Sequence, residues 1–498
     1  MHFIISTTIA CTSFLCGRTW STVGGNPQHS GISAIAAQDY VIARQVTAVD
    51  QNLAGSTRDI LAHYGAPMIT AANTVFIPVR TTTLDPNGDR MFQVEVRDGS
   101  TLALKTILAS DYRQPVYNGW VPSYSPALSG RNVYYFPGSG GTVYAVTEPD
   151  APVPVVSKQI AFFGNDNYNR DKADYDANVM ISTPIVSDRE GDIFFGFTVQ
   201  GGSTGLQSGV ARIGADGSGS WVSAQAAIGG APGTVPFNSV PVLSNLEQTL
   251  YFAVSNSSAG YLVSVNAATL APLNSTRLLD PATGDLALVT SDSSASPVVG
   301  LDGDVYYGVL ESNIPAHNER GWLLHFDASL KTVKTPGAFG WDDTPSIVPS
   351  DLVPSYQGTS KYLVLTKYNN YKNTGTGDGR NKIALLDPNN QTELDPVNGH
   401  TTVMNEVLTI LGVTPDGPPA SAVREWCINS AAVDRVTKSA IVNSEDGHLY
   451  RWDFTTNTFS QSIGLHGPLG EAYTPTVIGV DGTSWAINDG YLYAITNH

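Results

Sequence analysis

The segment Arg424-Glu425-Trp426 places a cation, a carboxyl group and an indole side by side. Glu425 could accept a proton or bind a cation. With Glu471 or Asp342 it could also form the carboxyl pair that glycoside chemistry uses as acid and base. The alternative, which we favour for these two neighbours, is a structural ion pair between Arg424 and Glu425.

A second reactive pair is Lys367-Tyr368. A lysine base and a tyrosine acid could together abstract and return a proton, as a lyase requires. The more ordinary interpretation, which we favour, is a solvated and packed end of a strand.

Metal chemistry has one candidate. Asp85, Asn87 and Asp89 have the D-x-N-x-D spacing that can surround Ca²⁺ with oxygen ligands. No convincing bidentate Glu stands at the downstream offset, which favours an Asx-type turn. The nine histidines are scattered, and neither H-E-x-x-H, G-x-S-x-G nor a P-loop occurs. Cys427 is expected to be a small buried hydrophobe rather than a nucleophile.

A repeat supplies the elements that must position these residues. A Ser/Thr/Ala-Pro step, a short apolar strand, a turn and an aromatic-rich strand recur eight times. The first five copies have prolines 56 to 59 residues apart, and the last three carry Pro, Ala and Pro at the same step: Pro67, Pro126, Pro184, Pro241, Pro297, Pro345, Ala431 and Pro475.

A third strand follows in every copy, with aromatic and β-branched residues that suit half-buried strands. These strands are Phe92–Val96, Val143–Val146, Val210–Ile213, Leu262–Val265, Leu323–Phe326, Ile383–Leu386, Leu449–Trp452 and Leu492–Ile495. Most copies add a fourth strand, for example Val153–Ile160, Thr276–Leu279 and Val403–Ile410.

The eighth copy stops after its third strand, and Tyr40–Val46 precedes the first copy without a partner. We therefore predict that Tyr40–Val46 completes the last blade and removes the open edge of the ring. The predicted fold is all-β: an eight-bladed β-propeller of four-stranded antiparallel blades. A seven-bladed ring is the alternative, because the interval from Pro345 to Ala431 is irregular at 86 residues.

In such a ring, the loops that lead into the innermost strands and the loops that join strands two and three open on one face. The latter include the long insertions 311–320 and 367–381. Aromatic, acidic and amide side chains in these loops suit a sugar or another polar ligand; packing between the blades is the alternative. The candidate ligand-binding residues are His63, Trp120, Asp176, Asn178, Trp341, Asp342, Asp343, Lys367, Tyr368, Arg424, Glu425, Trp426, Glu471 and Tyr473.

The net charge and the N-terminal residues limit which partners and which cellular compartment we expect. Lys and Arg number 27 against 44 Asp and Glu, a net charge of −17, which argues against nucleic acid as partner. Residues 1–19 begin with an apolar, uncharged stretch that predicts a signal peptide and a secreted or periplasmic protein. Residues 20–498 are then a single propeller domain, expected to be a monomer that is not integral to a membrane.

The sequence also resembles a known group. Residues 20–31 (WSTVGGNPQHSG), followed by Ser-Pro…Gly-x-Val-Tyr units, are similar to the PQQ-like β-propeller repeat proteins, a superfamily that includes quinoprotein dehydrogenases. The resemblance covers nearly all of the chain after the leader and implies the propeller fold. Catalytic members carry an Ala-x-Asp-x-x-Thr-Gly-x-x-x-Trp docking motif, of which only fragments such as 265–269 remain, and many carry a vicinal Cys-Cys that is absent here. These departures speak against PQQ, and no cofactor follows from the sequence apart from the Ca²⁺ candidate.

Three functions remain open. The first is a module that binds a carbohydrate or another polar ligand at the loop face. The second is an enzyme on the same scaffold, either a polysaccharide lyase or hydrolase that uses Glu425, Glu471 or Asp342, or a degenerate quinoprotein oxidoreductase. The third is a scaffold that binds protein partners.

Overall fold

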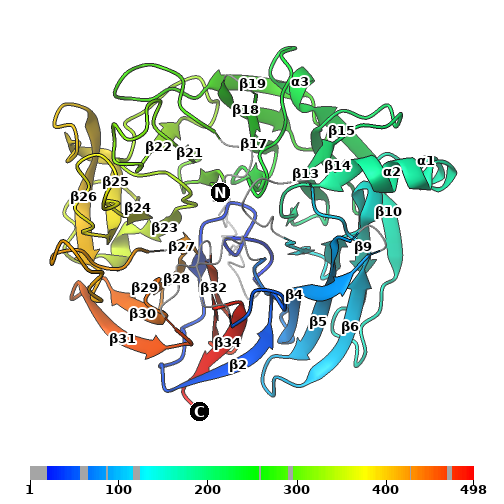
Figure 1. Cartoon of the computed structure of the whole chain (residues 1–498), viewed down its shortest axis with the longest axis horizontal. Helices are drawn as coiled ribbons and strands as arrows, with labels where there is room; N and C mark the ends of the chain where they lie inside the picture. Colours follow the sequence, from blue (N-terminus) through cyan, green and yellow to red (C-terminus); the bar gives the residue numbers. More distant parts are fainter. Residues whose placement is uncertain are drawn as a thin grey trace, which may run out of the picture.

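The computed structural model describes residues 20–55, 65–85, 88–115, 124–256, 259–289, 295–426, 428–467 and 474–498. Its strands form eight sheets that follow one another in chain order around a central axis (Figure 1). The eight-bladed ring is confirmed. The irregular 86-residue interval that suggested a seven-bladed ring contains one blade with unusually long outer strands.

Blades one to four each run from an innermost strand at the axis to an outer strand. Their strands are, in order, β3 Met68–Ile69, β4 Thr74–Leu84, β5 Arg90–Asp98 and β6 Leu104–Ser110; β7 Ala127–Leu128, β8 Tyr134–Pro137, β9 Thr142–Val146 and β10 Lys158–Ala161; β11 Val179–Ile181 with β12 Val186–Ser187, β13 Ile193–Val199, β14 Gly209–Ile213 and β15 Gly219–Ser223; and β16 Val242–Leu243, β17 Thr249–Ser255, β18 Gly260–Asn266 and β19 Pro272–Arg277.

Blades five to eight follow the same plan. Their strands are β20 Val298–Val299, β21 Val305–Val309 and β22 Trp322–Phe326; β23 Ser346–Pro349, β24 Tyr362–Tyr368, β25 Lys382–Leu394 and β26 Thr402–Leu411; β1 Ile32–Ser33, β28 Ala432–Asp434, β29 Ser439–Asn443, β30 His448–Asp453 and β31 Thr458–Gly464; and β27 Ile428–Ser430, β32 Thr474–Ile478, β33 Ser484–Asn488, β34 Tyr491–Thr496 and β2 Ile42–Ala48.

Blade five departs from the four-stranded prediction. Its sheet has three strands, and residues 333–337 take the fourth place only through isolated bridges of Val333 to Phe326 and of Gly337 to Leu323. Pro336 stands between these bridges and has no N–H to donate, so a regular ladder is interrupted there.

The N-terminal strand closes the ring as predicted. β2 pairs antiparallel with β34, with Ala43 opposite Ile495 and Ile42 opposite Thr496. The sequence prediction placed this strand at residues 40–46, two residues ahead of its observed bounds. The pairing joins the first and last parts of the chain in blade eight (Figure 1).

Residues 20–33, here called the axial segment, cross the centre of the ring (Figure 1). Their backbone carbonyls accept hydrogen bonds from the amides of innermost strands in six blades, and the Thr22 hydroxyl donates to the Ile185 carbonyl beside a seventh. The six amides, with distances of 2.8–3.2 Å, belong to Ile69, Leu128, Leu243, Val299, Ile347 and Val433. Most of them end their strands, so the axial segment fills the channel at the end opposite the loops that lead into those strands.

Short helices interrupt the repeat. Two stand between blades two and three, in a stretch that sequence analysis treated as a loop, and the rest lie at turns: α1 Asn165–Arg170, α2 Lys172–Asn178, α3 Ala224–Ala227, η1 Ser139–Gly141 and η2 Ser350–Leu352. Within the described part of the chain, no helix is long and apolar enough to cross a membrane.

Candidate functional site at the loop end of the channel

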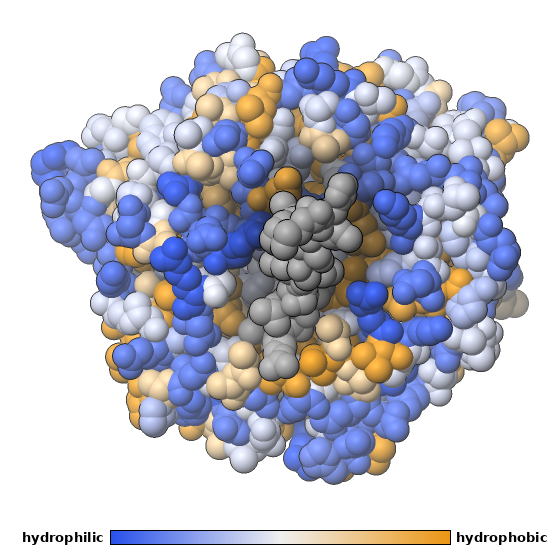
Figure 2. Space-filling view, turned by 180° about the vertical axis from the view of Figure 1, so that it is seen from behind, coloured by the Kyte–Doolittle hydropathy of each residue, from blue (hydrophilic) through white to orange (hydrophobic). Residues whose placement is uncertain are grey.

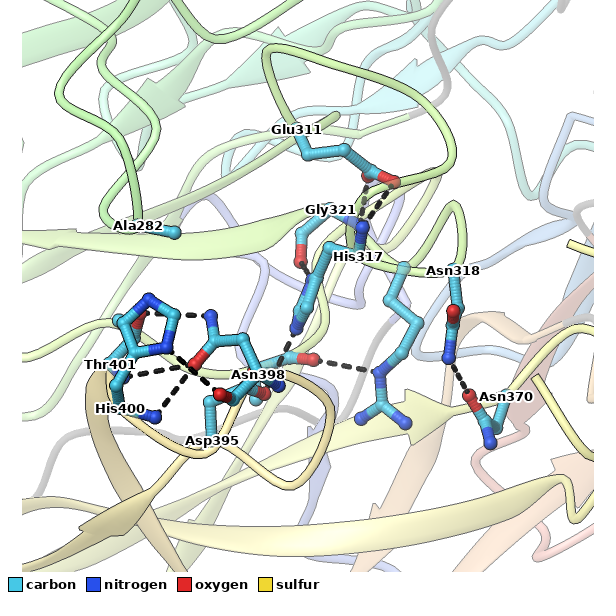
Figure 3. A network of polar contacts seen from close by, with 12 residues as sticks. Ala282, Glu311, His317, Asn318, Gly321, Asn370, Asp395, Asn398, His400 and Thr401 are labelled. Carbon is cyan, nitrogen blue, oxygen red and sulfur yellow. Dashed lines mark hydrogen bonds and ion pairs between the residues drawn. The ribbon is translucent and has the colours of Figure 1, made fainter. Parts of the chain in front are cut away.

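The end of the channel opposite the axial segment, here called the loop end, is formed by the lead-in loops and by the loops that join strands two and three. Figure 2 shows this side of the molecule, with hydrophilic residues gathered to one side of its centre. Two long loops, 310–321 of blade five and 369–381 of blade six, contact each other here. The Asn318 side-chain amide donates to Asn370 Oδ1 at 2.9 Å, and the Thr376 amide donates to Asn318 Oδ1 at 2.7 Å (Figure 3).

The loop of blade five is held by two buried side chains. The Glu311 carboxylate accepts hydrogen bonds from the amides of Glu319 at 2.8 Å and Gly321 at 2.9 Å. The His317 ring nitrogens face the Gly321 carbonyl at 3.0 Å and Asp395 Oδ1 at 2.9 Å (Figure 3). These contacts fix the loop before any ligand arrives, which lowers the entropy lost on binding.

Charged groups from three blades converge beside these loops. Asp342 and Asp343 lie in the lead-in loop of blade six, Glu319 comes from the long loop of blade five, and Glu425 comes from the lead-in loop of blade seven. Lys367 lies near the end of β24 and is only 3% exposed. We call these five residues the loop-end cluster.

Electrostatic effects connect the cluster. Burial raises the pKa of Asp343 to about 7, although the Lys367 ammonium and a 2.6 Å hydrogen bond from the Thr366 hydroxyl oppose the rise. Burial also raises the pKa of Glu425, again against Lys367. The pKa of Glu319 is raised by burial and then by the negative charges of Glu311 and Asp342. Since one ammonium influences both Asp343 and Glu425, it lies close to both.

Raised carboxyl pKa values change what the cluster can offer a ligand. A protonated carboxyl group donates one hydrogen bond and still accepts others, whereas a carboxylate only accepts. With its pKa at about 7, Asp343 can offer a carboxyl donor near neutral pH, and the raised pKa values of Glu319 and Glu425 shift these groups in the same direction. Such perturbed groups gathered at one end of a channel are typical of functional sites.

The structure places the reactive tripeptide of the sequence analysis differently from either interpretation. Arg424 Nε pairs with Asp416 Oδ1 at 3.4 Å, so the ion pair that we favoured for Arg424 and Glu425 is wrong in its partner. Trp426 is fully buried, and its indole N–H donates to the Asn381 carbonyl at 3.3 Å. Its side chain has no surface left for a ligand, so its role is to pack the core.

Two further candidates come from blade six. Trp341 is half-buried in the lead-in loop of blade six. Tyr368 is buried at the end of β24, with the Arg320 guanidinium carbon 4.2 Å from its ring centroid. Lys367 Nζ lies 5.8 Å from the Phe339 ring. The pair Lys367-Tyr368 is therefore packed, but it is not the solvated strand end that we favoured.

Three of the remaining described candidates, Asp85, Asp89 and Asp176, line a separate cleft of about 370 Å³ together with Arg113. Arg113 pairs with Asp89 at 3.2 Å. The Asp89 amide donates to Asp85 Oδ1 at 2.9 Å, which is the contact of an Asx-type turn, the alternative that we favoured over a Ca²⁺ site. Asn178, on α2, donates to Asp174 at 2.8 Å.

Five nominated residues, His63, Asn87, Trp120, Glu471 and Tyr473, and also Cys427, lie outside the described residues. Among the described ones, no group of three or more His, Cys, Asp or Glu side chains could hold a metal ion. At the loop end a buried ammonium stands among carboxyl groups with raised pKa values. These side chains suit hydrogen bonding to a ligand rather than the binding of a quinone together with a metal ion.

Sequence reasoning missed Glu319, Arg320 and Phe339. The length of insertion 311–320 was the available signal for the first two, but nothing in the local sequence distinguishes them from solvated loop residues. Phe339 lies just before Trp341 in a lead-in loop that was identified, and its neighbours were nominated instead.

Comparison with known proteins supports the fold. No protein-family model and no curated protein matches the sequence. Among solved structures, a europium-containing methanol dehydrogenase is similar with a TM-score of 0.57 and 10% identity, over 94% of this chain and 89% of that one. Sqt1 of Saccharomyces cerevisiae has a TM-score of 0.51 and 11% identity, over 93% of this chain and 100% of that one. At these identities the likeness shows the fold alone, a β-propeller that resembles the PQQ-like group.

Proposed function

We propose that this propeller is a binding module that holds a carbohydrate or another polar ligand at its loop end. One observation carries the proposal: three blades bring Asp343, Glu319 and Glu425, carboxyl groups with raised pKa values, to the end of the channel opposite the axial segment, where the buried Lys367 acts on Asp343 and Glu425. Burying so many ionisable groups is unfavourable for folding alone. A ligand that pairs with them explains why they are gathered there.

The chemistry of the cluster favours a polyhydroxy ligand. Each hydroxyl of a sugar both donates and accepts, and the cluster supplies both kinds of partner. Trp341, which is half-buried, adds aromatic surface next to the charged groups, and aromatic rings bind the apolar faces of sugars. Glu425, which is half-buried, would meet the ligand first, with Lys367 beneath it.

The location and state of the protein belong to the same proposal. A secreted or periplasmic protein meets free glycans, and the apolar first 16 residues are the basis for that assignment. A monomer suffices, because the cluster is assembled from three blades of one chain.

A glycan array with a parallel assay for newly released reducing ends tests the proposal. We expect wild-type protein to retain a subset of glycans and Glu425→Gln to weaken that binding at least about tenfold, as loss of a charged hydrogen-bond partner does. The matched control is Glu190→Gln, since the Glu190 side chain is 71% exposed in a turn of blade three. Binding that Glu425→Gln leaves unchanged would contradict the proposed site.

A hydrolase or lyase is the second candidate, favoured by the raised pKa of the half-buried Glu425. A carboxyl group whose pKa is raised keeps its proton to a higher pH and is better suited to act as a general acid. Release of reducing ends by wild-type protein, lost in Glu425→Gln, would replace the binding module with this enzyme.

A further inference from the structure

Arg320, at the end of the long loop of blade five, is a buried cation that forms no salt bridge among the described residues. The Asp395 carboxylate feels its charge: burial raises the pKa of Asp395, whereas His317 and then Arg320 lower it. It is 3% exposed. Its Nε donates to the Ala338 carbonyl at 3.0 Å, whereas its Nη2 is buried and has no hydrogen-bond partner. Among the residues that the structure describes, no carboxylate oxygen lies within 4.0 Å of its nitrogens. The Tyr368 hydroxyl beside it is also buried and has no partner.

Arg451 shows how the same chain satisfies a buried guanidinium elsewhere. Arg451 is 5% exposed and lies over the ring of Tyr40 at 5.0 Å, as Arg320 lies over Tyr368 at 4.2 Å. However, Arg451 Nη2 donates to the carbonyls of Ala37 at 3.1 Å and Gln38 at 2.6 Å. The two arginines share burial and an aromatic neighbour, and differ in that Arg451 Nη2 has two carbonyl acceptors whereas Arg320 Nη2 has none among the described residues.

An unpaired buried guanidinium is unfavourable, because burial removes its water and nothing replaces the lost hydrogen bonds. Its planar edge matches a carboxylate, which accepts two parallel hydrogen bonds from it. The Tyr368 hydroxyl could donate a third. A dianion such as phosphate fits less well, because Asp342, Asp343 and Glu311 lie on the same side of the channel and repel a second negative charge.

We propose that Arg320 and Tyr368 bind the carboxylate of an acidic sugar, so that the ligand of the loop end is a uronate-containing glycan. This inference rests on the proposed function, since it concerns the same site. The two parts are joined at Phe339: the Arg320 guanidinium carbon and Lys367 Nζ both lie 5.8 Å from its ring centroid. In this proposal the sugar unit faces the loop-end cluster and its carboxylate is bound at Arg320.

The test is calorimetric titration of the full protein with two matched probes, trigalacturonic acid and neutral galactotriose. We expect wild-type protein to bind the acidic probe at least about tenfold more tightly, as a charge-assisted pair requires. Arg320→Gln should remove that preference, and it also loses the Nε hydrogen bond to the Ala338 carbonyl, so the unfolding free energy of the variant is measured beside its binding. Tyr368→Phe, which changes one hydroxyl only, should weaken the acidic probe and leave galactotriose unchanged.

Arg451→Gln is the control. It should lower the stability of the unliganded protein, because its carbonyl contacts are lost, and keep the preference for the acidic probe. Equal binding of both probes by wild-type protein would overturn the acidic-sugar inference while leaving the proposed function in place. Binding of neither probe would overturn the inference, whereas the glycan array decides the proposed function separately. A preference that survives in both Arg320→Gln and Tyr368→Phe would also overturn it.

Discussion

At one end of the central channel, the axial segment is hydrogen-bonded to the innermost strands of blade after blade, whereas the other end brings together a buried lysine and carboxyl groups with raised pKa values. The first end is built from backbone donors and acceptors that satisfy each other. The second end gathers ionisable groups at which burial opposes charge. The difference separates a part of the molecule that stabilises the ring from a part that retains unfavourable electrostatics, which is typical of a site awaiting a ligand.

Burial also shifts the pKa values of titratable groups at the two ends in opposite directions. His29, in the axial segment, is fully buried with Nδ1 donating to the Pro297 carbonyl at 2.9 Å, and burial lowers its pKa to about 4. At the loop end, burial raises the pKa of Asp343 to about 7. The same physical cause disfavours the charged form in both cases, and it gives the two ends stability profiles of opposite slope.

The largest effect is expected from Gly31→Val, which disrupts the packing of the axial segment against the innermost strands. Gly31 has a φ of 72°, and a Cβ there would lie 2.5 Å from the Ala431 carbonyl oxygen. Steric overlap and backbone strain together should lower the free energy of unfolding by about 4 kcal/mol. Urea unfolding measures this loss. Gly217→Val is the control: its φ is 86° with nothing within 4 Å, so only strain should appear, about 1 kcal/mol. Equal losses in the two variants would show that the axial contacts do not hold the ring.

The next effect concerns the loop end. The Asp343 pKa is raised from 3.8 to about 7, so between these values the folded state binds a proton that the unfolded state has released. Stability contributed by protonated Asp343 is therefore lost as pH rises from about 4 to about 7, by about 4 kcal/mol. Asp343→Asn should lack this loss. The unfolding free energy of the variant should therefore rise relative to that of wild type as the pH increases from about 4 to about 7. Asp351→Asn, at a side chain 71% exposed, should follow wild type; a parallel course of wild type and Asp343→Asn would contradict the raised pKa.

His29→Asn should give the opposite slope at the axial end, with a smaller size. The His29 pKa is lowered from 6.5 to about 4, so the unfolded state binds a proton that the folded state does not. Stability is therefore lost as pH falls from about 6.5 to about 4, by about 3 kcal/mol. Asn accepts the positive φ of 56° at this position and can donate to the same carbonyl. The variant should thus fold and lose this slope; retention of the slope would assign it to another group.

The smallest effect is expected from Arg424→Gln. Its partner Asp416 is also paired with Lys372 at 2.6 Å, and the Arg424 side chain is 36% exposed. Loss of such a pair should change the unfolding free energy by about 0.5 kcal/mol or less, and glycan affinity by less than about twofold. A loss of glycan affinity as large as that of Glu425→Gln would show instead that Arg424 belongs to the binding site.

The eight-bladed ring could be predicted from the sequence because the repeat is local. Each copy contains its own proline step, turn and aromatic strand, so counting the copies was enough to predict the blades. The closing strand followed from the incomplete last copy. The path of the axial segment could not be predicted in this way, since its partners lie 49 to 402 residues away and nothing in its own residues encodes them. The helices α1 and α2 were missed because their sequence is rich in Asn and Asp, which favour turns.

The candidate site was predicted in part for a similar reason. Topology placed Asp342, Asp343, Lys367 and Glu425 at one end of the channel before any side-chain contact was known. Burial decided the rest: Trp426 packs inward because its indole N–H has an acceptor in Asn381, and Arg320 turns inward over Tyr368. Neither orientation follows from residue type.

Amide hydrogen exchange, measured with and without the glycan that the array binds most tightly, tests the central claim most directly. The account predicts that the glycan slows exchange in residues 318–321, 340–343 and 366–370 and in Arg424 to Trp426, and leaves the axial segment unchanged. Protection confined to the cleft lined by Asp85 and Asp176, or to the axial segment, would contradict a ligand site at the loop end.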